Sequence, residues 1–139
     1  KEHFPIVIHR SIMGTIGRFM GIILENSKGE LPLWLSPVQV KVLTITERNH
    51  KYAETIVKKL KENDIRVEND TENDTLDYKI RKAQLEKIPF VIVIGDKEEE
   101  KKTISVRNRK GKTRYNISID EFISDILNNI KNRLIYEEK

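Results

Sequence analysis

A dense run of basic side chains is the sequence feature with the clearest chemical meaning. Between Lys101 and Arg114 the chain carries seven basic residues and no acidic one, although the net charge of all 139 residues is only +4. If this run forms a β-hairpin, alternate side chains share a face, and Arg107 and Arg109 can point together at a polyanion. An edge strand protected by charge against aggregation would have the same composition, so both interpretations stay open here.

Acidic and amide side chains precede this basic run. Four carboxylates lie within residues 96–100, directly after an apolar run at 90–94 that is typical of a central strand. Ligands of open α/β sheets collect at the carboxyl ends of strands, and a carboxylate such as that of Glu98 can accept hydrogen bonds from a base edge. A charged surface turn explains the same residues more simply. Asn73 likewise either caps a predicted helix or reads a base edge with its amide.

Residue patterns for other chemistry are incomplete. The chain has no cysteine, which excludes a disulfide, a thiolate metal site and a cysteine nucleophile. Its three histidines, His3, His9 and His50, lack the spacing of metal ligands. The glycines around Thr15 lack the lysine and the spacing of a phosphate-binding loop. No complete catalytic constellation is present, and no segment is apolar enough over 18 residues to predict a membrane span.

The hydropathy pattern predicts the elements that must position these groups. A short strand is predicted at 4–8 and a helix within 12–24, and Pro32 and Pro37 prevent a regular helix at 31–37. We therefore expect a boundary there, with residues 1–30, a connector at 31–37 and a domain at 38–139. Because the chain begins without methionine, we also expect it to be a piece of a larger protein.

Residues 38–139 show an alternation of strand and helix patterns. Buried strands are predicted at 38–45, 65–67 and 90–94, a hairpin at 103–106 and 114–117, and helices at 52–60, 76–88 and 119–134. Ser118 and Glu121 have the spacing of a capping box at the start of the last helix. The prediction is an α/β domain with a mixed, mostly parallel five-stranded sheet and three helices.

Several stretches of the chain, taken in order, resemble one family of enzymes. Residues 9–19 (HRSIMGTIGRF) resemble motif 3 of class II aminoacyl-tRNA synthetases, and residues 32–40 (PLWLSPVQV) resemble the passage into their anticodon-binding domain. The match continues through YKIRKA at 78–83, IPFV at 88–91, GDKE at 95–98 and SVR at 105–107. Together these stretches resemble threonyl-tRNA synthetases. Residues 1–30 would then be a strand–helix remnant of the class II catalytic domain.

The resemblance implies roles for individual residues. Asn73, Glu98 and Arg107 match positions that contact the guanine and uracil shared by threonine anticodons. Lys97, Lys79 and Arg109 are expected next to backbone phosphates, from their charge and their proximity in the motifs.

The motif 3 stretch carries two further implied roles. Arg18 matches the arginine that contacts ATP, whereas Gly17 stands where the family usually has glutamate. His9 matches the third ligand of the catalytic zinc. One histidine cannot hold zinc by itself, so no metal and no other cofactor is expected in this chain.

The same resemblance implies what the larger protein does. Threonyl-tRNA synthetases ligate threonine to tRNA(Thr) with ATP through a threonyl-adenylate, using magnesium and zinc, and the full-length enzyme is expected to be a cytoplasmic homodimer without a membrane partner. This chain alone is expected to bind the anticodon loop and to be catalytically inactive, because motifs 1 and 2 and two zinc ligands are missing from it.

Other functions remain as alternatives at this point. A related module of a glycyl- or prolyl-type synthetase, or a non-catalytic accessory RNA-binding protein, would share the fold. A small nucleotide-binding enzyme of flavodoxin-like topology would instead bind mononucleotides without preferring tRNA. A protein-interaction domain would bind RNA, if at all, with little dependence on salt.

Overall fold

The chain forms two units, Lys1–Leu31 and Pro32–Lys139, and each is described by itself. The computed structural model describes residues 3–134. The first unit contains α1 (Ile16–Asn26), and the second contains every other element. These are β1 (Val40–Thr44), the 3₁₀ turn η1 (Glu47–Asn49), α2 (His50–Glu62), β2 (Val67–Asp70), α3 (Leu76–Leu85), β3 (Phe90–Ile94), α4 (Asp96–Lys101), β4 (Ile104–Asn108), β5 (Thr113–Ile117) and α5 (Ile119–Lys131).

The first unit corrects the prediction of a strand at 4–8. Residues 3–15 have no helix or strand, and α1 begins at Ile16, where the Thr15 side chain accepts a hydrogen bond from the Arg18 amide. A lone strand cannot persist because its backbone groups need a neighbouring strand, and all the described strands pair within the second unit. The predicted helix is confirmed, and Gly29, with φ of +77°, follows its end and donates its amide to Leu24.

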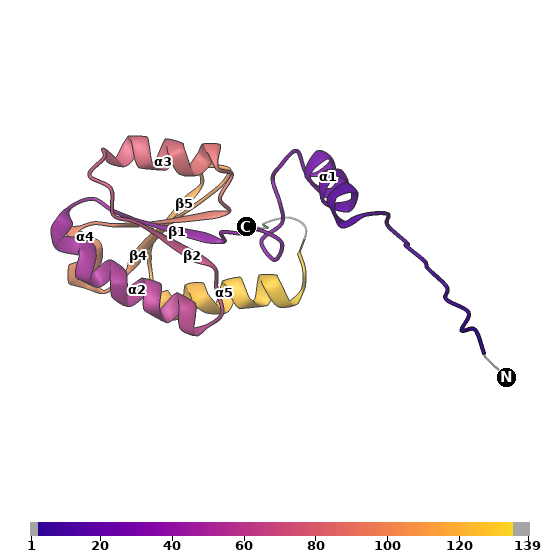
Figure 1. The fold of residues 1–139 in the computed structure, drawn as a ribbon. Helices are drawn as coiled ribbons and strands as arrows, with labels where there is room; N and C mark the ends of the chain where they lie inside the picture. The colour runs from indigo at the N-terminus through magenta and orange to yellow at the C-terminus, as the bar shows by residue number, and fades with distance from the viewer. Residues whose placement is uncertain (1–2, 135–139) are drawn as a thin grey trace. The chain divides into compact units, whose positions relative to one another are not determined.

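The second unit is a five-stranded mixed sheet with the strand order β2-β1-β3-β4-β5. β1 pairs in parallel with both β2 and β3, whereas β4 pairs antiparallel with β3 and with β5. Helix α3 covers one face of the sheet, and α2 and α5 cover the other (Figure 1). The predicted α/β class with a mixed five-stranded sheet is confirmed. Among residues 3–134, every helix is too short or too polar to cross a bilayer.

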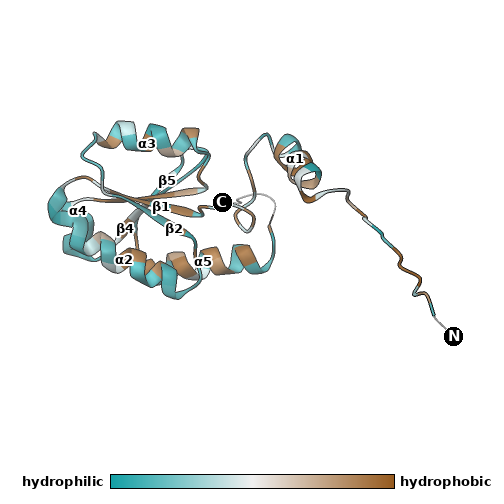
Figure 2. Ribbon diagram, viewed as in Figure 1, coloured by the Kyte–Doolittle hydropathy of each residue, from teal (hydrophilic) through white to brown (hydrophobic). Residues whose placement is uncertain are grey.

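Apolar packing is concentrated on the face under α2 and α5. Figure 2 shows hydrophobic and hydrophilic residues alternating along both helices, which is typical of helices that bury one face. Phe122 of α5 is fully buried and packs edge-on against Phe90 of β3, with ring centroids 5.7 Å apart. Ser118 caps α5 by accepting a hydrogen bond from the Glu121 amide, as its spacing predicted. Leu33, from the expected connector, is also part of this core.

Several elements differ from the sequence prediction in their bounds, and one helix was not predicted. β2 begins at Val67, two residues later than predicted, and continues through polar residues to Asp70, because its pairing with β1 defines it. Helix α5 ends at Lys131, which leaves Leu134 outside the helix. A fourth helix in this unit, α4, occupies the acidic segment after β3. Its formation depends on a hydrogen bond that hydropathy does not reveal.

Candidate nucleic-acid interface

Glu98, the third residue of α4, caps the start of this helix with its side chain. Its Oε2 accepts a hydrogen bond from the backbone amide of Gly95 at 3.1 Å, in the manner of a capping box. Its Oε1 accepts a second hydrogen bond, at 2.8 Å, from the hydroxyl of Ser105 on β4. Both carboxylate oxygens are therefore held in place, and each keeps a further lone pair for another donor. This geometry fixes the carboxylate that the sequence assigns to base recognition.

Arg107 lies on the same face of β4 as Ser105. The two residues are two positions apart on one strand, and they pair with Val91 and Val93 of β3. Arg107 is half-buried, and its Nε is buried without a hydrogen-bond partner among residues 3–134. The Glu98 carboxylate on α4, bound by Ser105, and the Arg107 side chain therefore meet the same face of β4, and Glu98 follows the end of β3 as the sequence predicts.

Arg109 does not continue this face. It follows β4 in the hairpin turn, where its Nε donates to the backbone oxygen of Lys87 at 3.0 Å and its amide donates to Pro89. These bonds attach the turn to the segment that leads into β3, at the opposite end of that strand from Glu98. Their spacing suggested that Arg107 and Arg109 point from the same strand face. They do not, because β4 ends at Asn108.

Asn73 lies in the exposed loop before α3. Its Nδ2 donates to Oε1 of Glu47 at 3.0 Å, which connects this loop to the η1 turn after β1. Thr75, and not Asn73, occupies the N-cap position of α3. The amide of Asn73 therefore has no capping function, which removes the simpler explanation of this residue.

A cleft of about 680 Å³ lies where β1 and β3 end, and we call it the edge cleft. Lys97 and Glu98 of α4 line it together with Thr46, which precedes η1, and Tyr115 of β5. Lys97 is exposed, so its ammonium is available to a ligand from solvent. The carboxyl ends of parallel strands are the usual ligand sites of such sheets, and the edge cleft follows this rule.

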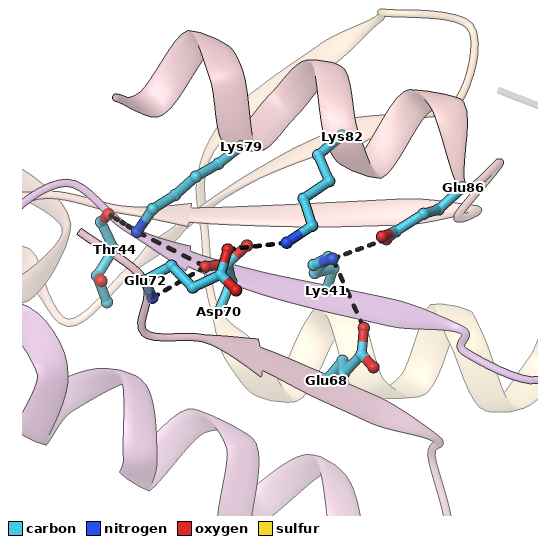
Figure 3. A network of polar contacts seen from close by, with 8 residues as sticks. All are labelled: Lys41, Thr44, Glu68, Asp70, Glu72, Lys79, Lys82 and Glu86. Carbon is cyan, nitrogen blue, oxygen red and sulfur yellow. Dashed lines mark hydrogen bonds and ion pairs between the residues drawn. The ribbon is translucent and has the colours of Figure 1, made fainter. Parts of the chain in front are cut away.

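Lys79 requires a correction. The sequence assigned it to phosphate contact, but its side chain is only 3% exposed beneath α3. Its Nζ lies 3.9 Å from Oδ1 of Asp70 and 3.5 Å from the backbone oxygen of Thr44 (Figure 3). An ammonium buried in this way cannot reach a phosphate at the surface, and its role in the structure is to pair with Asp70.

Lys79 belongs to a set of charges on this face of the sheet. Lys41 of β1 is also buried, and its Nζ contacts Glu86 at 2.7 Å and Glu68 at 3.6 Å (Figure 3). The half-buried Lys82 contacts Glu72 at 2.8 Å, and this hydrogen bond is the main cause of the lowered pKa of Glu72 and the raised pKa of Lys82. These pairs join α3 to β1, β2 and the loop between β2 and α3.

Sequence reasoning missed the residues that hold α4 in place. Asn49 is fully buried, and its Nδ2 donates to Asp96 at 3.1 Å and to Glu99 at 2.6 Å. Burial and the charge of Glu99 raise the pKa of Tyr52, whose hydroxyl donates to the backbone oxygen of Thr103. Neither these contacts nor the one from Ser105 has a signal in residue spacing, because the partners come from different elements.

Arg18 and His9 belong to the first unit. Arg18 lies on α1 and is exposed, and His9 lies in the segment without regular structure that precedes it. Within residues 3–134, no three His, Asp or Glu side chains gather closely enough to hold a metal ion. A single imidazole does not provide the donor set of a zinc site, so zinc chemistry cannot be derived from this chain.

Comparison with known proteins identifies the second unit. Residues 39–129 match the family model described as the anticodon binding domain, which covers more than half of the chain. The chain belongs to the anticodon binding domain family. The residues matched include Asn73, Glu98 and Arg107, and they run from the start of β1 into the last helix.

Relatives confirm the resemblance to threonyl-tRNA synthetases. The chain is 50% identical over 133 residues to a threonine–tRNA ligase of Sulfurihydrogenibium sp. (strain YO3AOP1) and 47% identical over 133 residues to that of Clostridium botulinum (strain Hall). Each match covers 96% of this chain and 21% of the relative, so the anticodon binding domain and its preceding unit span about a fifth of these ligases.

A solved structure agrees with the fold. The RNA binding domain of threonyl-tRNA synthetase from Cryptosporidium parvum Iowa II superimposes with a TM-score of 0.79 at 33% identity. The match covers 86% of this chain and 30% of that chain.

Proposed function

We propose that this chain reads the anticodon loop of tRNA(Thr) as part of a threonine–tRNA ligase. The observation that carries the proposal is that the Glu98 carboxylate of α4, held by Gly95 and Ser105, contacts the face of β4 that also carries Arg107. The named relatives support the choice of tRNA, because they are threonine–tRNA ligases.

In this proposal the three readers act by hydrogen bonding to base edges. Glu98 accepts from amino or imino hydrogens of a base, since its oxygens retain lone pairs after binding Gly95 and Ser105. Arg107 donates to carbonyl oxygens, which guanine and uracil both offer, or to N7 of guanine. Asn73 can do both, once its amide exchanges Glu47 for a base. Unstacked anticodon bases expose these edges to side chains.

Basic side chains supply affinity that does not depend on sequence. Lys97 lies exposed at the edge cleft, next to Glu98, and is proposed to contact a backbone phosphate. Arg109 is proposed as a weaker phosphate neighbour, because its Nε already binds the Lys87 oxygen. Phosphate contacts position an RNA on the protein, and base contacts specify it.

The activity of the longer protein belongs to the same proposal. A threonine–tRNA ligase would use ATP and magnesium, with Arg18 contacting ATP and His9 as one of three zinc ligands. We also propose a cytoplasmic homodimer for the longer enzyme and no ligase activity for this chain alone. Threonine-dependent pyrophosphate exchange tests the last point, and measurable exchange by the purified chain would refute it.

Binding to two anticodon stem-loops tests the proposed function directly. One RNA carries the threonine anticodon, the other has its guanine and uracil replaced, and both are titrated across a series of salt concentrations. We expect a preference for the threonine anticodon that persists as salt rises, because base contacts release few counterions. Equal binding to both RNAs that disappears as salt rises would mean that the chain binds RNA only through its positive charge and does not read the bases.

A further inference from the structure

An exposed aromatic side chain stands beside Glu98 without a role in the proposed readout. Tyr115 of β5 is 69% exposed and lines the edge cleft. The resemblance to threonyl-tRNA synthetases assigned nothing to this residue. A large exposed aromatic side chain next to a fixed carboxylate is the combination that holds a nucleobase, because the ring covers the face of the base while the carboxylate binds its edge.

A β-bulge determines where Tyr115 lies. Ile104 pairs with Ile117 and Val106 pairs with Arg114, so two residues of β5, Tyr115 and Asn116, stand opposite the single residue Ser105 of β4. Asn116 adopts a φ of +55°, the left-handed conformation that an irregular strand position of this kind requires. Bulges redirect side chains and are frequent next to functional sites.

The bulge brings Tyr115 to the residue that orients Glu98. Ser105, opposite the bulge, is the residue whose hydroxyl donates to the Glu98 carboxylate at 2.8 Å. Tyr115 and Glu98 both line the edge cleft, and Lys97 and Lys101 line it as well. One cleft therefore offers an aromatic ring, a hydrogen-bond acceptor and two cationic side chains, which match the face, the edge and the phosphate of a nucleotide.

We propose that Tyr115 stacks on the nucleobase whose edge is bound by Glu98. The inference rests on the proposed function, and it adds to that function a contact with the face of one anticodon base. A second exposed tyrosine, Tyr78 on α3, is 57% exposed and does not line the edge cleft. It provides a matched control for the loss of an exposed aromatic ring.

The test compares Tyr115→Ala, Tyr115→Phe and Tyr78→Ala in the 139-residue chain. Three RNAs are used: the threonine anticodon stem-loop, and two versions in which either the guanine or the uracil is replaced by an abasic nucleotide. We expect Tyr115→Ala to weaken binding to the intact loop roughly 10-fold, the effect of losing one stacked base. Tyr115→Phe and Tyr78→Ala should each bind within about 2-fold of the unmodified chain. Both variants keep an aromatic ring at position 115.

The abasic loops and the salt dependence separate stacking from other roles. Tyr115→Ala should cost little further affinity with one of the two abasic loops, since the base it would stack on is already gone. The slope of binding against salt should be unchanged, because no charge is removed. Equal affinity of Tyr115→Ala and the unmodified chain, or an equal loss with all three RNAs, would overturn the inference.

The variant Glu98→Gln, measured in parallel, distinguishes a failure of the stacking inference from a failure of the proposed function. If Glu98→Gln loses base preference while Tyr115→Ala changes nothing, the readout stands and the stacking is refuted. If the unmodified chain shows no preference for the threonine anticodon, the proposed function fails. Tyr115 is then still judged by the comparison of intact with abasic loops.

Discussion

The two faces of the sheet differ in what they bury. Under α2 and α5 the strands contribute mainly apolar side chains to a continuous core, with Val42, Leu60 and Phe122 completely enclosed. Under α3 a smaller apolar cluster, built around Leu43 and Val91, lies beside the buried ammonium groups of Lys41 and Lys79. Ser105 and Arg107 of β4 share this second face.

The apolar face contributes mainly to stability, whereas the charged face lies beside the residues that we propose to recognise RNA. A continuous apolar core gains free energy from every side chain that it removes from water, and it leaves no polar group for a ligand. The face under α3 stabilises less, because burying charges costs desolvation that their ion pairs only offset. This face also carries Arg107 and, through Ser105, binds the Glu98 carboxylate, the two side chains that we propose contact RNA. Substitutions on the two faces should therefore affect different measurements.

Phe122→Ala should have the largest effect. The side chain is fully buried against Phe90, so we expect a loss of roughly 3–5 kcal/mol in the free energy of unfolding. Urea denaturation measures it, and Leu85→Ala, at a site on α3 that is 76% exposed, is the control that should change little. A change of base preference in the folded Phe122→Ala chain would contradict the division between the two faces.

Lys79→Met tests the charged interior. Removing the ammonium leaves the buried Asp70 carboxylate without its ion pair, and we expect a loss of about 3 kcal/mol in the free energy of unfolding. The double variant with Asp70→Asn should recover most of this loss, because it removes the buried charge as well. Single and double variants that are equally unstable in urea would show that Lys79 stabilises through packing alone.

Arg107→Ala should affect binding more than folding. We expect a loss of about 1–3 kcal/mol in the binding free energy of the threonine stem-loop, together with weaker discrimination against replaced bases. Lys97→Ala is the matched comparison, and it should weaken binding to every loop to a similar extent and reduce the salt dependence. Titrations with both stem-loops measure these effects, and equal discrimination in the two variants would reverse the assignments.

Ser105→Ala isolates the orientation of Glu98. The substitution removes the hydroxyl that donates to Oε1 while the Gly95 amide still binds Oε2, so α4 should remain formed. We expect a loss of about 1 kcal/mol in discrimination between the two stem-loops, the usual contribution of one hydrogen bond. Ser105→Thr should restore the discrimination. A Ser105→Ala chain that discriminates like the unmodified one would mean that the Gly95 amide alone orients the carboxylate.

The smallest effect concerns the ion pair of Glu72 and Lys82 at the surface. The hydrogen bond from Lys82 lowers the pKa of Glu72, so folding favours the ionised carboxylate. Its contribution to stability is present above the ordinary glutamate pKa and is lost as the pH falls through the lowered value. Lys82→Ala should raise the pKa of Glu72 in an NMR titration of its carboxyl carbon. An unchanged value would show that Lys82 does not act on it.

Residue patterns alone predicted the elements whose signals are local. Phe90–Ile94 was recognised as a central strand from its continuous apolar run, and the start of α5 from the spacing of Ser118 and Glu121. The candidate readers Asn73, Glu98 and Arg107 came from acidic, basic and amide side chains together with the family resemblance, and their role in RNA binding stays a prediction. For the strand and the helix start, the information lies within a few residues of sequence, whereas the readers also needed the ordered motifs of the family.

Tertiary structure decided everything that depends on contact between distant segments. Only pairing with β1 extends β2 to Asp70, and only burial under α3 turns Lys79 from a surface cation into the partner of Asp70. The bond between Ser105 and Glu98 and the bulge at Tyr115 likewise join separate elements. The reason is physical: residue types fix which groups can bond, but the free energy of a polar contact depends on which partner the fold brings near and how much water it excludes.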